Sequence, residues 1–264
     1  MLLFIIYFLF LGLIVGSFLN VVILRYNTGY SLSGRSGCFS CGHGLAWYEM
    51  IPVASYLVLC GRCKHCHSRI SRQYPLVEIF TGLLFALTAW RFYPNMSAVL
   101  FYCLILSLLV VVVVYDLKHK IIVDTPVYAF ILLSVMSPAI LNWKNALSTE
   151  VGFQIFLNLV SGAVIFLAFF SLWYFSRGRW MGFGDAKLGF GIGALLGFSG
   201  SVNAVVLAFW FGALVGLSLI GLGKIKSLKS FRRKFSIKSE IPFAPFLVLG
   251  LLLSLFANIS ILVF

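Results

Sequence analysis

The chain has 264 residues, of which 61% are hydrophobic and only 10% are charged, and its mean hydropathy is +1.05. So few charges cannot cover the surface of a water-soluble domain of this length, which excludes an ordinary soluble enzyme. The formal charge of +13 is typical of lysines and arginines retained in the cytoplasmic loops of a membrane protein, so we expect membrane lipid and no nucleic acid as a partner.

Apolar runs along the chain predict an all-α polytopic membrane protein with about eight transmembrane helices. About 20 apolar residues cross the hydrocarbon core of a bilayer as a helix. The run at 188–200 is short and rich in glycine, and it reaches the usual length only when extended back to Gly184. The first run has no basic region before it and no clear cleavage site, so we expect a span and not a removable signal peptide. The expected spans are 2–24, about 75–90, 97–115, 121–141, 153–175, 188–200, 203–222 and 241–263.

The basic residues predict the orientation of these spans. With eight spans, 18 of the 20 lysines and arginines fall in loops on one face, and only Arg91 and Lys144 fall on the other. The positive-inside rule makes the basic face cytoplasmic, so we expect a multi-pass protein of the bacterial inner membrane with both termini outside. The chain then divides into a first transmembrane helix (1–24), a cytoplasmic cysteine-rich domain (25–74) and a seven-helix core (75–264).

Small residues repeat along one face of the first span. Glycine at a four-residue spacing lets two helices approach closely without any chemistry being involved. We therefore interpret Gly12, Gly16, Ser17 and Asn20 as a helix-packing face.

Two CxxC pairs in the cytoplasmic domain, Cys38-Phe-Ser-Cys41 and Cys63-Lys-His-Cys66, have the spacing of a zinc ribbon. Two residues between thiolates let both sulfurs reach one tetrahedral ion, and a loop of this size has too small a core to fold without such support. We expect structural zinc on these four cysteines, and not a reactive redox pair, because thiolates that share a metal are closed. The alternatives for one ligand are Cys60, His43, His65 and His67.

Two of the seven acidic residues are predicted to lie at the same depth on the same face. Asp116 ends the third span, and Asp185 opens the sixth within Met181-Gly-Phe-Gly-Asp185. A carboxylate near hydrocarbon costs several kcal/mol unless it is paired or wetted, although either aspartate alone is also explained as a helix cap at the interface. Two close carboxylates cannot both be ionised. One keeps a proton while the other takes a proton from water, which is the chemistry that hydrolyses an amide.

Further residues near the two aspartates are candidates for supporting roles. Gly182 and Gly184 lack side chains, so they let a substrate backbone lie against the chain and permit non-helical dihedral angles before Asp185. Asp124 either orients the site or caps the next helix, and we expect the cap. Glu78, deeper in the second span, has an open role, and Lys187 is a further possible supporting residue.

In order and spacing, these residues resemble the type IV prepilin peptidases, which belong to the GxGD class of intramembrane aspartic proteases. The resemblance covers almost the whole chain and implies that Asp116 and Asp185 are the catalytic pair and that 75–264 is the peptidase core. The four cysteines match the cytoplasmic metal-binding loop of the family. The matching motifs are Gly16-Ser-Phe-Leu-Asn-Val-Val-Ile23, the paired CxxC loop, Arg72-Gln-Tyr-Pro-Leu-Val-Glu78, Asp116 with Asp124, residues 182–187, and Pro242-Phe-Ala-Pro-Phe246.

The resemblance implies two activities. The family removes the basic leader from prepilins and pseudopilins on the cytoplasmic side, and many members then methylate the new amino terminus with S-adenosylmethionine. No GxGxxG loop follows a strand in this sequence, so the methyl transfer rests on the resemblance alone. The sequence departs from the family at Val123, where proline is usual, and at Ala244, where glycine is usual.

Two other functions remain open from the residues themselves. A transporter could use Asp116, Asp124 and Asp185 to bind a cation or relay protons. Transport sites usually lie at the bilayer midplane between inverted repeats, whereas these aspartates lie at one surface and no internal repeat is found. A membrane-anchored zinc module that only recruits partners would leave the Gly182–Asp185 stretch unexplained.

Overall fold

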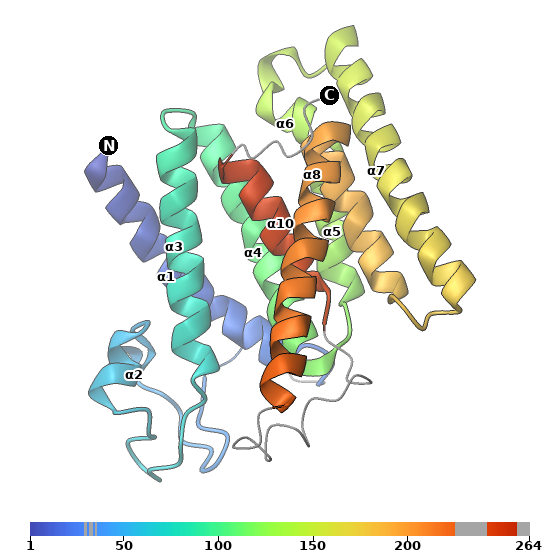
Figure 1. The fold of residues 1–264 in the computed structure, drawn as a ribbon. Helices are drawn as coiled ribbons and strands as arrows, with labels where there is room; N and C mark the ends of the chain where they lie inside the picture. Colours follow the sequence, from blue (N-terminus) through green and yellow to red (C-terminus); the bar gives the residue numbers. More distant parts are fainter. Residues whose placement is uncertain (29–30, 32–33, 35, 225–241, 258–264) are drawn as a thin grey trace. The chain divides into compact units, whose positions relative to one another are not determined.

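The computed structural model describes residues 1–28, 31, 34, 36–224 and 242–257 of the chain (Figure 1). Arg35, the basic stretch 225–238 and the ends of the predicted span 241–263 lie outside the described residues. The helices, in chain order, are α1 (Leu2–Arg25), η1 (Trp47–Met50), α2 (Ala54–Val58), α3 (Gln73–Phe92), α4 (Met96–His119), α5 (Asp124–Val135), α6 (Ser137–Leu141), η2 (Trp143–Asn145), α7 (Thr149–Ser176), α8 (Phe183–Lys224) and α10 (Ala244–Ala257).

The regular structure of the described residues is helical, apart from two isolated antiparallel bridges in the cysteine-rich loop. In this part of the chain, five helices are long and apolar enough to cross a membrane: α1, α3, α4, α7 and residues 183–219 of α8. The apolar helices α5 and α10 are shorter. The prediction of an all-α polytopic fold is confirmed, and the count of eight spans stays a prediction.

Helix α8 is not one straight rod. Its 42 residues would extend about 63 Å as a continuous helix, twice the hydrocarbon thickness. Gly197 interrupts it with φ 70° and ψ −179°, a conformation that is essentially restricted to glycine because it has no Cβ. The runs expected at 188–200 and 203–222 therefore lie in the two segments that meet at Gly197, and Figure 1 draws these segments as separate rods.

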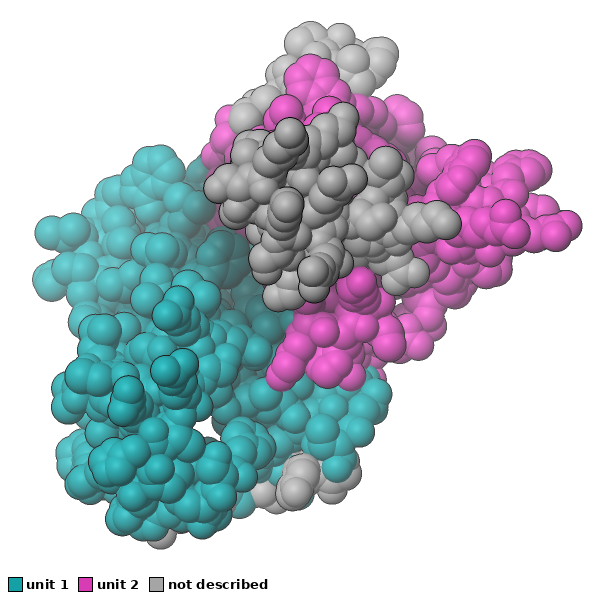
Figure 2. Space-filling model, turned by 60° about the horizontal axis from the view of Figure 1, so that its bottom comes forward, with its two compact units in different colours: residues 1–114 teal, residues 115–264 magenta. Residues whose placement is uncertain are grey.

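The chain divides into two compact units, residues Met1–Val114 and Tyr115–Phe264 (Figure 2). In the first unit, α1 and α3 pack with their backbones unusually close. A Cβ added at Gly12 would lie 2.8 Å from the Cα of Gly82, and one added at Gly16 would lie 2.8 Å from the Cα of Glu78. The predicted packing face is confirmed, since only glycine permits this approach.

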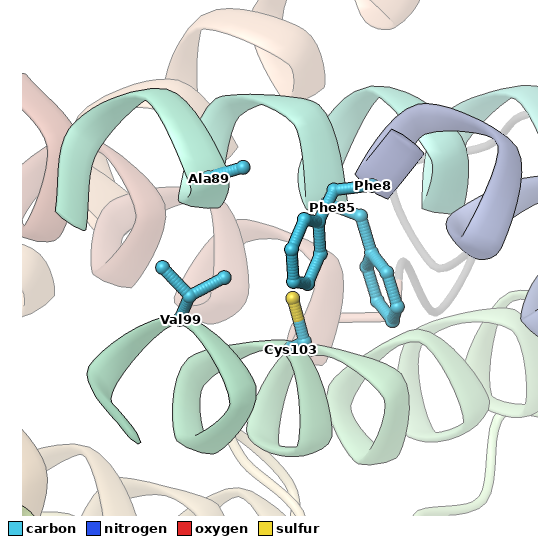
Figure 3. Packing of buried hydrophobic residues seen from close by; sticks show 5 residues of the cluster. All are labelled: Phe8, Phe85, Ala89, Val99 and Cys103. Carbon is cyan, nitrogen blue, oxygen red and sulfur yellow. The ribbon is translucent and has the colours of Figure 1, made fainter. Parts of the chain in front are cut away.

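A hydrophobic cluster joins three helices of the first unit (Figure 3). Phe8 of α1 and Phe85 of α3 turn their rings toward Cys103 of α4, with Ala89 and Val99 beside them. All five side chains are buried. Cys103 is therefore a packing residue in this cluster.

In the second unit, α8 packs against α5, α7 and α10. The glycines of its first segment explain this packing. A Cβ added at Gly193 would lie 2.7 Å from the carbonyl oxygen of Ser161 on α7. Glycine by itself weakens a helix. The glycine-rich run is nevertheless helical, because the absence of side chains lets neighbouring helices pack closely against it.

Candidate active site and metal centre

Asp116 and Asp185 come together in the second unit. Asp116 lies in the last turn of α4 and Asp185 in the first turn of α8. Their side chains are only 4% and 7% exposed, respectively. The two carboxyl groups are close enough for the charge on Asp116 to act on Asp185. The fold therefore brings within electrostatic range of each other two acids that are 69 positions apart in the sequence.

The two carboxyl groups have different partners. The backbone N–H of Gly182 donates to Oδ2 of Asp185 at 3.2 Å, and the N–H of Asp185 returns a bond of 3.2 Å to the Gly182 carbonyl. The backbone N–H of Ala244, at the start of α10, interacts with Asp116. Oδ2 of Asp116 is buried and has no hydrogen-bond partner among the described residues. Because an unpaired buried oxygen is costly, this atom is suited to bind a proton, a water or a substrate group.

Gly182 and Gly184 differ in how much space a side chain would have at each position. Gly182 lies just before α8 and Gly184 lies in its first turn, and neither is among the described glycines with positive φ. A Cβ added at Gly184 would lie 2.7 Å from the Cβ of Ile122, whereas one at Gly182 would make an ordinary 3.4 Å contact with Oδ2 of Asp185. Gly184 is thus required by close packing of α8 against the segment before α5.

Gly184→Ala is expected to destabilise the protein by about 1–3 kcal/mol, because the new methyl group overpacks against Ile122 and moves the turn that holds Asp185. Thermal unfolding in detergent measures this effect. Gly182→Ala is the matched control, with little expected change in unfolding, and Ile122→Gly should restore part of the lost stability in the double variant. A Gly184→Ala protein as stable as the wild type would contradict the packing argument.

Asp124 and Lys187 form an ion pair between α5 and α8. Nζ of Lys187 lies 2.7 Å from Oδ1 of Asp124 and about 5 Å from the ring centroids of Tyr128 and Phe183. The expectation that Asp124 caps α5 is wrong, since Val123 is the N-cap and no side-chain capping bond forms. The carboxylate turns to Lys187 instead. Asp124 is 59% exposed, so the pair contributes about 0–1 kcal/mol and acts mainly on the position of the turn at Asp185.

Glu78 belongs to the first unit and holds the cysteine-rich loop against α3. Its Oε2 accepts the backbone N–H of Val53 at 2.8 Å, and the hydroxyl of Ser17 bonds the same carboxylate. Val53 has φ 61°, a rare and strained conformation for a β-branched residue. Glu78 therefore stabilises an unusual backbone at the start of α2.

The sulfurs of Cys38, Cys41, Cys63 and Cys66 all lie within 4.8 Å of one another. Each pair is held in a small hairpin, one closed by the bridge between Gly37 and Gly44 and the other by the bridge between Arg62 and Arg69. Tetrahedral Zn–S bonds of about 2.3 Å require sulfurs about 3.8 Å apart. The Cys38 and Cys66 sulfurs are 3.8 Å apart, so the residues fit a tetrahedral metal ion.

Hydrogen bonds favour the thiolate, the form that binds a metal, at two of the four cysteines. The backbone N–H groups of Cys41 and Ser40 lower the pKa of Cys38 to about 6. The hydroxyl of Ser68 lowers the pKa of Cys66. The backbone N–H of His43 lowers the pKa of Cys41, but burial and the neighbouring Cys38 and Cys66 thiols outweigh it and raise this pKa to about 11. Cys60 and the three histidines of the loop do not belong to the cluster found among the described residues. The ring of His43 contacts the tilted ring of His65, with centroids 3.5 Å apart.

Comparisons with known proteins match both the N-terminal segment and the segment that carries the two aspartates. A model of the bacterial peptidase A24 N-terminal domain matches residues 10–92, and a model of the type IV leader peptidase family matches residues 103–217. A prepilin leader peptidase/N-methyltransferase of Burkholderia pseudomallei is 32% identical over 272 residues, which cover 91% of this chain and 81% of the relative. The chain belongs to the type IV leader peptidase family.

Two further relatives carry the same name. The protein of Myxococcus xanthus is 38% identical over 227 residues, covering 83% of this leader peptidase and 64% of the relative. The protein of Pseudomonas putida is 30% identical over 271 residues, which cover 91% of this chain and 86% of the relative. The chain thus spans just under two thirds of the length of the Myxococcus relative. No solved structure matches this leader peptidase.

Membership in the family confirms the resemblance to prepilin peptidases that the sequence motifs indicated. This leader peptidase is therefore an enzyme. Its apolar helices and its family together indicate a multi-pass protein of the inner membrane. The transporter alternative receives no support. Both aspartates lie within the segment matched by the leader peptidase model, whereas the four cysteines and Glu78 lie within the N-terminal domain model.

The two cysteine hairpins of this leader peptidase suggest a test of the ligand set. His67 and Gly42 occupy equivalent positions, four residues after the first cysteine of each pair, with φ 55° and 69°. His67→Gly is expected to keep the metal and to raise the free energy of unfolding by about 1 kcal/mol, since glycine accepts this conformation without a steric cost. Metal analysis and thermal unfolding measure the two effects. Loss of the metal would instead make His67 a ligand.

Proposed function

We propose that this leader peptidase cleaves the basic leader from type IV prepilins or pseudopilins at the cytoplasmic membrane face, with Asp116 and Asp185 as its catalytic pair. One observation carries the proposal: two buried carboxyl groups, from α4 and α8, lie within reach of each other's charge, and one of their oxygens is unpaired. Buried acids at a membrane boundary are rarely retained without a function.

In the proposed reaction, the two aspartates hold one proton between them. The ionised carboxylate takes a proton from a water, and the oxygen of that water attacks the carbonyl carbon of the scissile bond. The protonated carboxyl donates its proton to the leaving nitrogen. The C–N bond then breaks, which gives a new carboxylate on the leader and a free amine on the mature protein.

Supporting residues keep the pair in place. The Gly182 N–H bond fixes the rotamer of Asp185, and the narrow contact of Gly184 with Ile122 fixes the turn that precedes it. The ion pair of Asp124 with Lys187 connects the same turn to α5. Positioning of this kind contributes to catalysis because a displacement of about 1 Å at the reacting atoms is costly.

The cysteine cluster is proposed to hold a structural zinc ion within a cytoplasmic domain of residues 25–74, after the first transmembrane helix (1–24) and before the peptidase core (75–264). The sulfur spacing matches zinc, and four thiolate ligands leave no open position for catalysis. The orientation that we propose, with the active site in the cytoplasm and both termini outside, rests on the distribution of basic residues.

The second proposed activity is methylation of the new amino terminus, as the names of the relatives indicate for those proteins. S-adenosylmethionine would supply a methyl group on a sulfonium. The free amine released by cleavage attacks the methyl carbon, and an N–C bond forms as the C–S bond breaks. The amine then loses a proton to solvent, and the donor is left as a neutral thioether.

The test uses the full chain in detergent micelles or membranes with a candidate prepilin and methyl-labelled S-adenosylmethionine. Mass spectrometry of the product should show loss of the leader and one added methyl group on the new amino terminus. An intact prepilin after incubation with folded enzyme would overturn the proposed cleavage. A cleaved product without the label would restrict the enzyme to proteolysis.

A further inference from the structure

The segment that forms η1 and α2, residues 46–59, exposes most of its large apolar and aromatic side chains. It contains a single charged residue, Glu49, which is only 9% exposed and accepts the backbone N–H of Ala46 at 2.8 Å. The charge is thus turned inward, whereas a loop in water exposes its charges and buries its apolar side chains. The exposed side chains are Trp47, Tyr48, Met50, Ile51, Leu57 and Val58, with exposed fractions from 41% to 82%.

The same segment is held at the depth of a membrane span. The N–H of Val53, the residue before α2, donates to Oε2 of Glu78 at 2.8 Å. Glu78 stands five positions after Gln73, the first residue of α3, and therefore lies about 7.5 Å along the helix axis from its start. Helix α3 is long and apolar enough to cross a membrane. The start of α2 therefore lies beside this span and not beyond its end (Figure 1).

The exposed apolar surface continues on α3 at this depth. Leu76 and Phe80, two residues to either side of Glu78, are 64% and 47% exposed. On a helix that crosses a bilayer, such side chains face lipid. Lipid therefore covers α3 at the positions that flank the bond to Val53.

Basic residues adjoin the apolar segment. Nζ of Lys64 lies 3.2 Å from the hydroxyl oxygen of Tyr48 and 5.1 Å from its ring centroid. The N–H of Arg62 donates to the carbonyl of Leu59, just after α2, at 3.0 Å, and Arg72 directly precedes α3. All three basic residues are exposed. Tryptophan and tyrosine beside lysine and arginine are the composition of a segment at the membrane–water interface.

We propose that residues 46–59 form an interfacial anchor, which lies in the headgroup layer of the leaflet where α3 begins and binds anionic phospholipid. The exposed apolar side chains enter the upper part of the acyl chains, and Arg62, Lys64 and Arg72 bind lipid phosphates. A bilayer fits this surface better than a protein partner does, because the bond to Glu78 keeps the segment where lipid surrounds α3. The anchor fixes the cysteine-rich loop to the membrane surface, and it rests on neither activity proposed above.

Photolabelling of the full chain in nanodiscs measures this contact. The discs contain phosphatidylcholine and phosphatidylglycerol, and one of the two lipids carries a diazirine near the carbonyl end of an acyl chain. Peptide mapping by mass spectrometry should find the label within 47–58 and at Leu83 of α3, which is 56% exposed and is the internal reference for lipid contact. Phosphatidylglycerol is expected to label 47–58 about 2-fold or more above phosphatidylcholine, because basic residues attract anionic headgroups.

Leu57→Gln/Val58→Gln is expected to lower the label within 47–58 by about 5-fold or more relative to Leu83, because polar amides are excluded from acyl chains. The two side chains are 67% and 82% exposed, so these exchanges leave the packing of the chain itself intact. Leu57→Met/Val58→Ile is the matched control, which keeps both side chains apolar and should be labelled as the wild type.

The wild-type result does not depend on any variant folding. A wild-type chain labelled at Leu83 but not within 47–58 would overturn the anchor, and crosslinking of 47–58 to an added prepilin in that case would assign the surface to a protein partner. Equal labelling by the two lipids would overturn the role of the basic residues. Cleavage and methylation are measured in separate assays, so failure of the anchor is distinct from failure of either activity.

Discussion

Replacing Asp116 or Asp185 by asparagine is expected to lower the rate of leader cleavage by about 100- to 10,000-fold, the usual contribution of a general acid or base. Asparagine has nearly the same shape as aspartate, but it can neither accept a proton from water nor donate one to the leaving amine. Both side chains are buried, and the small change in shape keeps the local packing. The measurement is the cleavage rate of a prepilin by purified variants.

Two comparisons make this test decisive. Glu150→Gln replaces an exposed acid with its amide and should cleave at the wild-type rate. The double variant Asp116→Asn/Asp185→Asn should be no slower than the slower single variant, because residues that act as one unit do not contribute additively. Near-normal cleavage in either single variant, with the protein inserted and folded, would remove the aspartate pair as the catalytic centre.

Loss of zinc is expected when Cys38 and Cys66 are both changed to serine. Structural zinc in small peptide sites contributes about 10–16 kcal/mol of apparent binding free energy at neutral pH, and two missing thiolates leave too few ligands to hold the ion. Metal analysis of the purified wild type should give about one zinc per chain, and the double variant almost none. The cysteine-rich loop should then become sensitive to protease, since its small core depends on the metal.

Cys60→Ser is the control for this experiment. Cys60 is an exposed free thiol in the same loop, but it lies outside the group of four sulfurs. This variant should keep its zinc and its resistance to protease. Zinc retained at the full level in Cys38→Ser/Cys66→Ser would contradict the assigned ligands, and zinc lost from Cys60→Ser would place Cys60 among them.

The main features of the fold and of the site are local properties of the sequence. Whether a segment is apolar and long enough for a membrane span depends only on its own residues, so the helical membrane fold was predictable. The CxxC spacing allows two sulfurs to reach one ion over four residues, so the four-cysteine cluster was predictable too. Asp116 and Asp185 were singled out because charge is rare and expensive at a membrane boundary.

The tertiary structure decided what depends on partners distant in the sequence. The capping role expected for Asp124 was wrong because Lys187, 63 residues away, is a stronger partner than the nearby backbone N–H groups. The role of Glu78 became visible only from its bond to Val53, across 25 residues. Glu49 was not singled out at all, although an acid within the apolar stretch around Trp47 was a signal that could have been used.

The sequence by itself thus determined which segments are apolar helices, which cysteines cluster and which acids lie at a membrane boundary. Only the tertiary structure decided that Gly197 bends α8, that Gly184 lies against Ile122, and that Glu78 holds the start of α2 beside α3. The physical reason is that hydropathy and ligand spacing are summed over neighbouring residues, whereas close packing and the pairing of buried charges depend on which distant segments meet.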